Sequence, residues 1–325
     1  MNASGTSRSL RRVVSTTLAL ALVMNRASLT AYAWNNRGHM MVAAVAYQKL
    51  TQQTKDRVDA LLAFNPDRDN WFDLIPEGTS VASTKMMIFM IAATWADRIK
   101  SHPDYHTDGT HNGNRPPTDG TANNNIGFDD LARHKYWHFI DLPFTLDSTT
   151  LLPVPTPNAQ TRITDFRAVL ASTSPDELKS YDLSWLLHLV GDVHQPLHCA
   201  TRVRATKPDG DDGGNGVALS ASPGKLHSFW DGLLGSGNSP VTARTAALSL
   251  PSAPGPAADD LDTQHWIDES FNAAKSTVYK NPPIGAGIGP FTLTPTYKTA
   301  ARTLAEKRVA LAGARLAKIL NDELR

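Results

Sequence analysis

The segment His188-Leu-Val-Gly-Asp192-Val-His-Gln-Pro-Leu-His198 is the most informative stretch of this 325-residue chain. His188 and Asp192 are four residues apart, so a helix places both side chains on one face. The helix is expected to stop before Pro196, which takes His198 off that face. The neighbouring residues are apolar and predict burial: Trp185, Leu186, Leu187, Leu189 and Val190. Buried His and Asp side chains need polar partners, and a metal ion would supply them.

Further candidate ligands follow the same logic. In the string Leu-His-Ser-Phe-Trp-Asp, His227 and Asp231 are again four residues apart. Asp97 ends an apolar helical stretch, where a carboxylate is more often a solvated surface charge. His138 lies in a segment expected to be extended, over residues 137–141, where a single histidine is usually part of the core. Alone these signals are weak, but beside the first segment they indicate one metal centre.

The first 33 residues have the pattern of a secretory signal peptide. Basic residues come first, then an apolar or small-residue run over 13–24, and then the cleavage pattern Ala31-Tyr-Ala33. A membrane-spanning helix needs about 20 residues, more than this run has, although an uncleaved anchor is a second interpretation. We expect cleavage between Ala33 and Trp34, which leaves residues 34–325 as a single domain.

Cleavage would give Trp34 a free α-amine, which together with the Trp34 carbonyl oxygen can chelate a metal ion. The pKa of an α-amine, about 7.7–8.0, is low enough for a metal to displace the proton. His39 could join this site after a tight turn, whereas an ordinary new N-terminus would be disordered. Nitrogen and oxygen donors without thiolates favour a multinuclear hydrolytic zinc site over a structural zinc finger. The nine candidate ligands are Trp34, His39, Asp97, His138, His188, Asp192, His198, His227 and Asp231.

The net charge and the cysteine content further limit the class of protein to which the chain can belong. Removing residues 1–33 takes away four arginines and no acidic residue, so the formal net charge goes from +1 to −3. A protein with this net charge cannot bind a long nucleic-acid duplex by neutralising phosphates alone. Bound zinc would nevertheless make the charge locally positive. Cys199 is the only cysteine, so no intrachain disulfide forms, and no Asn-x-Ser/Thr sequon follows Trp34. A bacterial periplasmic or secreted protein fits these features best.

The mature chain is expected to be all-α, with long surface loops. Apolar residues recur with helical spacing, and the Ser-Pro pair at 174–175 is a helix start signal, with Pro175 as the first helical residue. Helices are predicted over residues 39–51, 55–64, 85–100, 175–195, 226–234, 262–279 and 297–324. Loops are predicted over residues 101–125 and 249–260, and a short β-hairpin is possible at 213–219.

The order of the nine ligands resembles that of the trinuclear-zinc single-strand nucleases. These are secreted nucleases and 3′-nucleotidases within the zinc-dependent phospholipase C/nuclease superfamily, and this chain looks like a bacterial-type member. The most specific matching strings are Ala-Thr-Trp-Ala-Asp97, His138-Phe-Ile-Asp141, Gly-Asp192-Val-His-Gln-Pro-Leu-His198 and His227-Ser-Phe-Trp-Asp231. The match spans about two hundred residues of the mature chain.

The resemblance implies a helical bundle of the phospholipase C/nuclease type with three zinc ions at the bottom of a cleft. One site would use Asp97, His138, His188 and Asp192, and a second the Trp34 amine and carbonyl, His39 and the bridging Asp192. The third would use His198, His227 and Asp231. The implied activity is hydrolysis of single-stranded DNA or RNA to 5′-phosphate products, with 3′-nucleotides as further substrates. No protein partner and no stable membrane association after signal cleavage are implied.

Four more residues match positions that handle substrate in this family. Asp141 corresponds to a carboxylate that hydrogen-bonds the base edge or helps to orient water. Lys100 corresponds to a cation near the phosphate, and both are predicted to have catalytic roles. Phe139 corresponds to an aromatic on which a base stacks, and Asn215 fits a family string; the alternative for Asn215 is that it only closes a turn. Judged without the resemblance, Phe139 would be a core residue, Asp141 a turn cap and Lys100 a solvated charge.

Two other functions remain open on the sequence. A zinc-dependent phospholipase C would use the same kind of helical metal-binding scaffold, but such relatives generally have Glu at the position of Asp231. A secreted zinc-binding or scavenging protein would saturate the coordination shell of the metal and leave no position for water. Departures from the family pattern, such as the apolar Leu142-Pro-Phe-Thr-Leu after Asp141, leave the base preference undecided.

Overall fold

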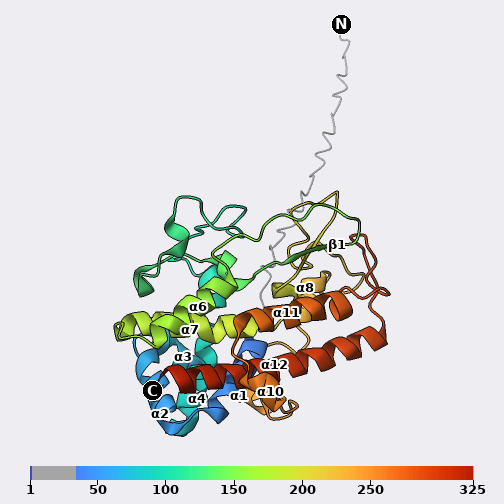
Figure 1. Ribbon diagram of the computed structural model, residues 1–325. Coiled ribbons are helices and arrows are strands. Elements are labelled where there is room, and N and C mark those ends of the chain that lie inside the picture. Colours follow the sequence, from blue (N-terminus) through green and yellow to red (C-terminus); the bar gives the residue numbers. More distant parts are fainter. Residues whose placement is uncertain (2–33, 325) are drawn as a thin grey trace. The chain divides into compact units, whose positions relative to one another are not determined.

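The computed structural model describes Met1 and residues 34–324, and the regular structure from Trp34 onward is almost entirely helical (Figure 1). This confirms the predicted all-α class. The predicted signal peptide lies outside the described residues, apart from Met1. None of the helices in the described part of the chain combines the length and the apolar character needed to cross a membrane.

The α-helices are α1 (Asn36–Lys49), α2 (Gln52–Leu62), α3 (Arg68–Trp71), α4 (Val81–Ala92), α5 (Trp95–Arg98), α6 (Ala159–Leu170), α7 (Asp176–Asp192), α8 (Leu226–Asp231), α9 (Pro240–Ala247), α10 (Gly255–Asp259), α11 (Thr263–Ala273) and α12 (Pro295–Glu323). The short 3-10 helices are η1 (Phe72–Leu74), η2 (Ile99–Ser101), η3 (Thr121–Asn123), η4 (Gly127–Asp129), η5 (Lys135–His138) and η6 (Pro196–His198), and η7 (Ala274–Val278) is a π-helix. The strands are β1 (Pro143–Thr145) and β2 (Thr201–Val203).

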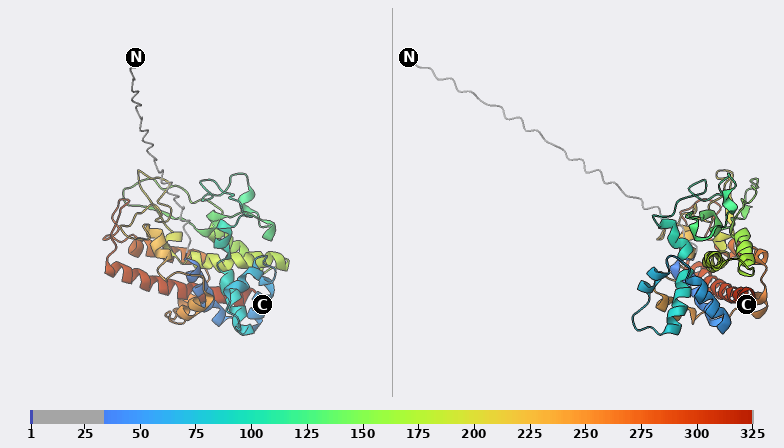
Figure 2. Two further views of the ribbon diagram at one scale, coloured as in Figure 1. Left: turned by 180° about the vertical axis from the view of Figure 1, so that it is seen from behind. Right: turned by 90° about the vertical axis from the view of Figure 1, so that its left-hand side faces the viewer.

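Helix α7 is the central element of the fold. It packs against α1, α2, α5, α6 and α12, and Figures 1 and 2 show α6 and α7 side by side. Every residue of α7 from 179 to 192 is buried. A helix that is enclosed on all sides has no solvated polar face, so polar side chains on it must be satisfied inside the protein. His188 and Asp192 are two of these side chains.

Two glycines let the helices around α1 approach closely. A Cβ atom on Gly191 would lie 2.8 Å from His39 Nδ1, and one on Gly313 would lie 2.5 Å from Val45 Cβ. Side-chain carbons do not approach this closely without displacement, so α7 and α12 reach α1 because these positions have no Cβ. The contact at Gly191 places His39 directly beside α7.

The single helix predicted over residues 85–100 is wrong, because α4 ends at Ala92 and α5 begins at Trp95. Thr94 leaves the ideal helical conformation, with φ −100° and ψ −2°, and its hydroxyl donates to the Ile91 carbonyl at 2.7 Å. Such a local hydrogen bond competes with the helix. The break between α4 and α5 changes the direction of the chain just before Asp97.

The hairpin predicted at residues 213–219 is also wrong. The two strands are parallel, far apart in sequence, and Pro143 pairs with Thr201. Residues 212–216 form a turn over the Asp211 carboxylate, which accepts from the Gly214 N–H at 3.1 Å. Within the described residues, this region contributes only isolated bridges, such as the antiparallel one between Ala218 and Lys225.

Smaller differences concern element boundaries. Residues 137–141, predicted to be extended, begin in the 3-10 helix η5 and become extended only at Phe139. The predicted loop over 249–260 contains the short helix α10, whereas residues 101–125 contain little regular structure, as expected. Helix α7 begins at Asp176, one residue later than predicted, with Pro175 at the capping position.

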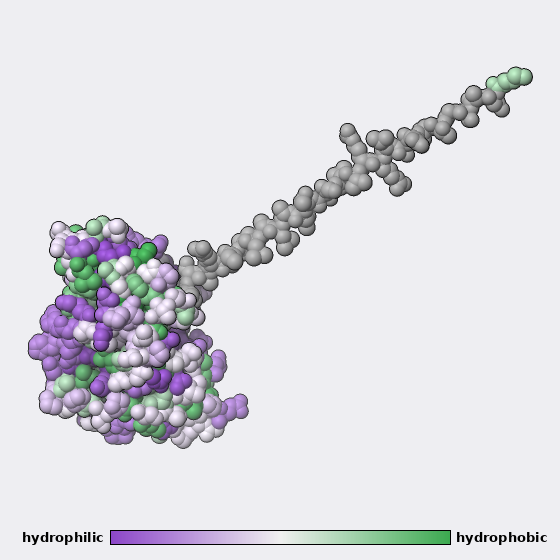
Figure 3. Space-filling model, turned by 90° about the vertical axis from the view of Figure 1, so that its right-hand side faces the viewer, coloured by the Kyte–Doolittle hydropathy of each residue, from purple (hydrophilic) through white to green (hydrophobic). Residues whose placement is uncertain are grey.

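The surface is mixed in polarity. On the face drawn in Figure 3, hydrophobic residues occur in small groups among hydrophilic ones. Scattered exposed apolar residues are normal for a folded domain.

Candidate metal centre

Five of the predicted ligands, including Asp192, converge at one end of α7. They come from α1, α5, η5 and α7, and all are buried: His39, Asp97, His138, His188 and Asp192. The Asp192 carboxylate lies 3.3 Å from His39 Nε2, 3.0 Å from His138 Nδ1 and 3.3 Å from His188 Nε2. Asp97 Oδ1 lies 3.6 Å from His188 Nε2 and 3.9 Å from His138 Nδ1. One carboxylate therefore faces three imidazoles, while a second carboxylate faces two of them.

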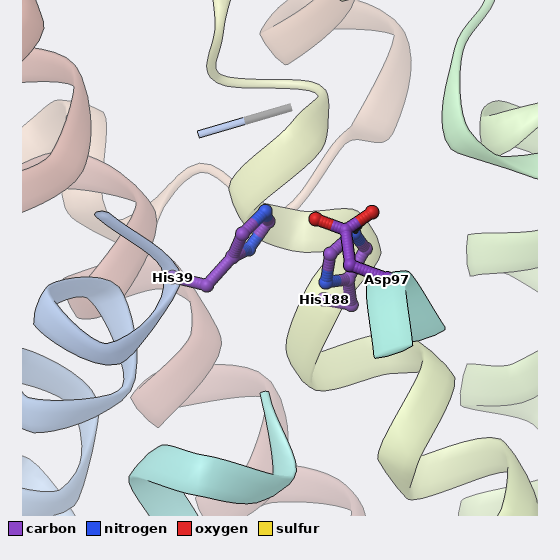
Figure 4. Close-up of side chains that lie close together, drawn as sticks. All are labelled: His39, Asp97 and His188. Carbon is purple, nitrogen blue, oxygen red and sulfur yellow. Dashed lines mark ion pairs between the residues drawn. The ribbon is translucent and has the colours of Figure 1, made fainter. Parts of the chain in front are cut away.

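Figure 4 shows His39, Asp97 and His188 pointing toward one another from three different helices. The rings of His39 and His188 are stacked, with centroids 3.7 Å apart and an interplanar angle of 17°. Ligand atoms of these three residues lie within 4.8 Å of one another, as do those of His138, His188 and Asp192. The residues around Asp192 thus offer two overlapping groups of donor atoms, which share His188.

A third group consists of His198, His227 and Asp231, whose ligand atoms also lie within 4.8 Å of one another. His198 ends η6, and α8 supplies the other two residues, with His227 Nε2 3.6 Å from Asp231 Oδ2. All three side chains are buried. The four-residue spacing predicted for α8 and α7 is therefore realised on both helices, and Pro196 separates His198 from the α7 face as expected.

The donor atoms of these groups fit a metal ion. Several are buried without a hydrogen-bond partner among the described residues: Asp97 Oδ2, His138 Nε2, His188 Nε2, Asp192 Oδ1 and His198 Nε2. Leaving a buried polar atom unsatisfied costs about 1–3 kcal/mol. Divalent cations that prefer nitrogen and oxygen ligands would satisfy these atoms, and zinc is the borderline-soft cation that this donor set suits.

Backbone carbonyls orient three of the imidazoles. Nδ1 of His188 bonds to the Ala93 carbonyl at 2.8 Å, that of His198 to the His138 carbonyl at 2.6 Å, and that of His227 to the Gly213 carbonyl at 2.6 Å. A carbonyl can only accept, so each Nδ1 carries the proton and each Nε2 is left as the donor atom for a metal. The Gln195 amide similarly holds Asp231, donating to its Oδ1 at 2.9 Å.

The protonation states also suit metal binding. Burial and the charge of Lys100 lower the pKa of His138 to about 3, and burial and His188 lower that of His39 to about 4. Burial opposes ionisation of Asp97, but Lys100 and the nearby imidazoles outweigh it and lower its pKa to about 2. At neutral pH these histidines are neutral and Asp97 is a carboxylate, which are the forms that bind metals.

The pKa of Asp231 shifts in the opposite direction to that of Asp97. Burial raises its pKa well above the usual range, the hydrogen bond from Gln195 opposes this, and the charges of Asp97 and Asp192 add to the rise. A bound cation would offset this repulsion and restore the carboxylate.

The remaining predicted residues are placed as follows. Lys100, on η2, is buried and donates to Asp97 Oδ1 at 2.7 Å, so it is not a solvated charge. Phe139, the residue after His138, and Asp141 line a cavity of about 80 Å³ that opens to solvent. Burial, then Asp212 and Asp211, raise the pKa of Asp141 well above its usual range. Asn215 is outside this cavity, and its side-chain amide closes a turn by donating to the Asp212 carbonyl at 2.9 Å.

The Trp34 side chain is fully buried in the main core, and the next residue ties the start of the domain to the third group. The Asn35 N–H donates to the Asp231 carbonyl at 3.3 Å. Trp34 therefore lies close in the chain to a residue that contacts α8, and the beginning of the domain is held at the metal centre.

Sequence reasoning missed the groups that support the ligands. The carbonyls of Ala93, His138 and Gly213 carry no side-chain signal, because any residue supplies a carbonyl. Gln195 stood inside the quoted segment, but its contact with Asp231 depends on the packing of α8 against the end of α7, which no local pattern indicates.

A helical fold with three buried groups of His and Asp side chains is the arrangement expected of a metal-dependent hydrolase. The S1/P1 nuclease family model matches residues 34–325, and the chain belongs to this family. It is also 25% identical over 339 residues to Endonuclease 4 of Arabidopsis thaliana, with 97% of this chain and 96% of the plant protein covered. The protein is therefore a nuclease, a hydrolase of phosphodiester bonds, from a family whose enzymes depend on zinc.

Metal removal is expected to destabilise the fold, because the unsatisfied buried donors lose the cation that compensates them. Each ion at a concentration 1,000 times its Kd contributes about 4 kcal/mol, which corresponds to a fall in Tm of roughly 10 °C per site lost. Differential scanning calorimetry before and after chelation, and after zinc is added back, measures this. An unchanged Tm in the metal-free protein would contradict a structural contribution from bound metal.

Proposed function

We propose that this protein is a zinc-dependent endonuclease that hydrolyses single-stranded DNA and RNA to 5′-phosphate products and also hydrolyses 3′-nucleotides. The observation that carries the proposal is the convergence of eight buried His and Asp side chains in three groups, together with a cavity lined by Phe139, the residue after His138. The family assignment supplies the reaction class, and the cavity supports a preference for unpaired bases.

Three zinc ions are proposed, with ligand sets that follow the observed groups. Asp97, His138, His188 and Asp192 would hold one ion. The Trp34 amine and carbonyl, His39 and Asp192 would hold a second, which makes Asp192 the shared ligand. The third would use His198, His227 and Asp231. His39 lies in the same group as Asp97 and His188, consistent with a close pair of ions.

Zinc supplies Lewis-acid activation of water and stabilisation of negative charge on phosphate oxygens. The protein residues supply geometry and electrostatics. Lys100, paired with Asp97, places a positive charge at the edge of the centre, where it would attract the phosphate. Asp141, in the adjoining cavity, would hydrogen-bond the edge of the base or orient water.

The cavity favours an unpaired base. Phe139 lines it together with apolar residues of the chain segment 152–157, so a base can stack on the ring while its edge faces polar side chains. A paired base would first have to leave the stack, at a cost of a few kcal/mol. We therefore assign Phe139 and Asp141 to substrate binding and expect single strands to be cleaved faster than duplexes. Asn215 remains a candidate only through the loop that it stabilises beside His227.

Export is part of the proposal. Residues 1–33 would be removed as a signal peptide, and the single domain 34–325 would act in the periplasm or outside the cell. Cleavage before Trp34 is then a step in building the metal centre, because it creates the α-amine ligand.

Replacing Phe139 with Ala is expected to lower kcat/KM for single-stranded oligonucleotides by about 5- to 150-fold, since base stacking contributes about 1–3 kcal/mol. The zinc content should not change. Wild-type cleavage of a single strand, the matching duplex and phosphatidylcholine should be measured under the same conditions. Faster hydrolysis of the phospholipid, or equal cleavage of duplex and single strand, would contradict the proposed function.

A chain with two extra residues before Trp34 is expected to bind fewer zinc ions than one that begins at Trp34. The extension converts the α-amine into an amide, which is a poor metal ligand. Metal analysis of both purified proteins, with circular dichroism as a folding control, measures the difference. Three ions and full activity in the extended protein would rule out the amino terminus as a ligand.

A further inference from the structure

Residues 101–125 form an anchored element rather than a solvated excursion. The Asp108 carboxylate accepts from the His134 backbone N–H at 3.0 Å and from the Tyr136 hydroxyl at 2.7 Å, and it lies 2.7 Å from His134 Nδ1. The backbone of His106 pairs with that of Leu131 and Arg133. These contacts fasten the segment to the chain that leads into η5 and the ligand candidate His138.

The anchored segment ends in a tight turn that presents Arg115. The backbone N–H and carbonyl of Thr110 pair with those of Arg115 at 2.9 and 3.2 Å, and the three residues at the tip have positive φ. Gly109 packs against this turn so closely that a Cβ atom would lie 2.2 Å from the Arg115 carbonyl oxygen. Lys135 Nζ also donates to the carbonyl of Asn112 at the tip. The position of Arg115 is therefore fixed by the backbone.

Arg115 lines the same cavity as Phe139 and Asp141. Its Nη2 donates to Asp209 Oδ1 at 2.9 Å, across 94 residues of sequence, so two separate loops meet at the cavity. A guanidinium group has five N–H donors in a planar fork, and Asp209 orients this fork. Arg115 also lies near enough to Asp141 to act against the rise in its pKa.

The charges in the cavity argue for a base rather than a phosphate. Three carboxylates line it, and two of them are paired with basic side chains: Asp209 lies 2.9 Å from Arg115 and Asp212 lies 2.7 Å from Lys207. Because both basic side chains are already paired with carboxylates, little positive charge is left to bind a phosphate, whereas the carboxylate oxygens match the N–H donors of a base. N–H donors from a bound base would also favour the ionised form of Asp141.

We propose that Arg115 is a specificity-determining residue that makes this cavity prefer guanine. An arginine fork donates to guanine O6 and N7, whereas the N6 amino group of adenine opposes it with another donor. The Asp141 carboxylate accepts from guanine N1–H and the N2 amino group, so the two residues read adjoining edges of one base stacked on Phe139. This inference rests on the proposed single-strand nuclease activity.

The test uses thymidine oligonucleotides with one central G, A or 7-deazaguanine, incubated with the zinc-loaded enzyme. The kcat/KM for cleavage next to the central base is expected to be at least about fivefold higher for G than for A, the lower end of the discrimination that a bidentate base contact gives. The 7-deaza base lacks N7, so it should lose much of this advantage. Binding of guanosine against adenosine, measured by calorimetry, gives the same comparison without turnover.

Arg115→Gln is expected to bring the G-to-A ratio of kcat/KM close to one. The matched control is Arg57→Gln, because Arg57 also pairs with an aspartate at a partly exposed site, on α2. This control should keep the wild-type ratio. If Arg115→Gln does not fold, the wild-type comparison of G with 7-deazaguanine still decides the question.

The outcomes separate the two proposals. No cleavage of any oligonucleotide by the wild-type enzyme would count against the proposed function, and the nucleoside binding experiment would still test Arg115. Cleavage with equal rates at G and A, or an unchanged ratio in Arg115→Gln, would overturn the inference alone. An equal loss on every base in Arg115→Gln would assign Arg115 to the phosphate instead.

Discussion

The desolvation of charge around Asp192 is the constraint on which the structure depends. Three imidazoles and a second carboxylate surround this residue at the buried end of α7, and several of their polar atoms have no hydrogen-bond partner in the described part of the chain. Burying such atoms is expensive, and ion pairs inside a protein seldom repay the full cost of desolvation. A cation that completed this group of donors would stabilise it, so we expect metal binding and folding to be coupled.

The packing of the helices allows the ligand side chains to converge at the end of α7. Gly191 lets α7 lie against His39, and the break between α4 and α5 sends Asp97 toward α7 while the Ala93 carbonyl receives the His188 N–H. Rigid carbonyl acceptors hold three imidazoles with Nε2 directed at the centre. The segment over 101–125 is fastened beside the same centre through Asp108. The chain belongs to the S1/P1 nuclease family, and in this framework the proposed substrate residue Phe139 directly follows the proposed metal ligand His138.

The sequence predicted the parts of this arrangement that depend on local spacing. The pairs on α7 and α8 were predictable because residues four apart share a helix face, and Pro196 marked the end of α7. The all-α class followed from periodicity. The break at Thr94, the parallel pairing of β1 with β2 and the turn over Asp211 were not predictable, because each depends on contacts between distant segments. The spacing and the donor types indicated one multinuclear metal centre, whereas the division of the ligands among three sites came from the family resemblance. In the structure, Asp141 and Phe139 line a cavity, whereas the Asn215 side chain closes a turn.

The most direct test of the account is the zinc content of the mature protein and of its Asp192→Ala variant, measured by mass spectrometry with circular dichroism to confirm folding. If Asp192 is the ligand shared by two ions, the wild-type chain holds three zinc ions and the variant keeps only the one bound by His198, His227 and Asp231. A variant that retains all three, or a wild-type chain that binds none, would contradict the claim that the buried charge around Asp192 exists to hold metal.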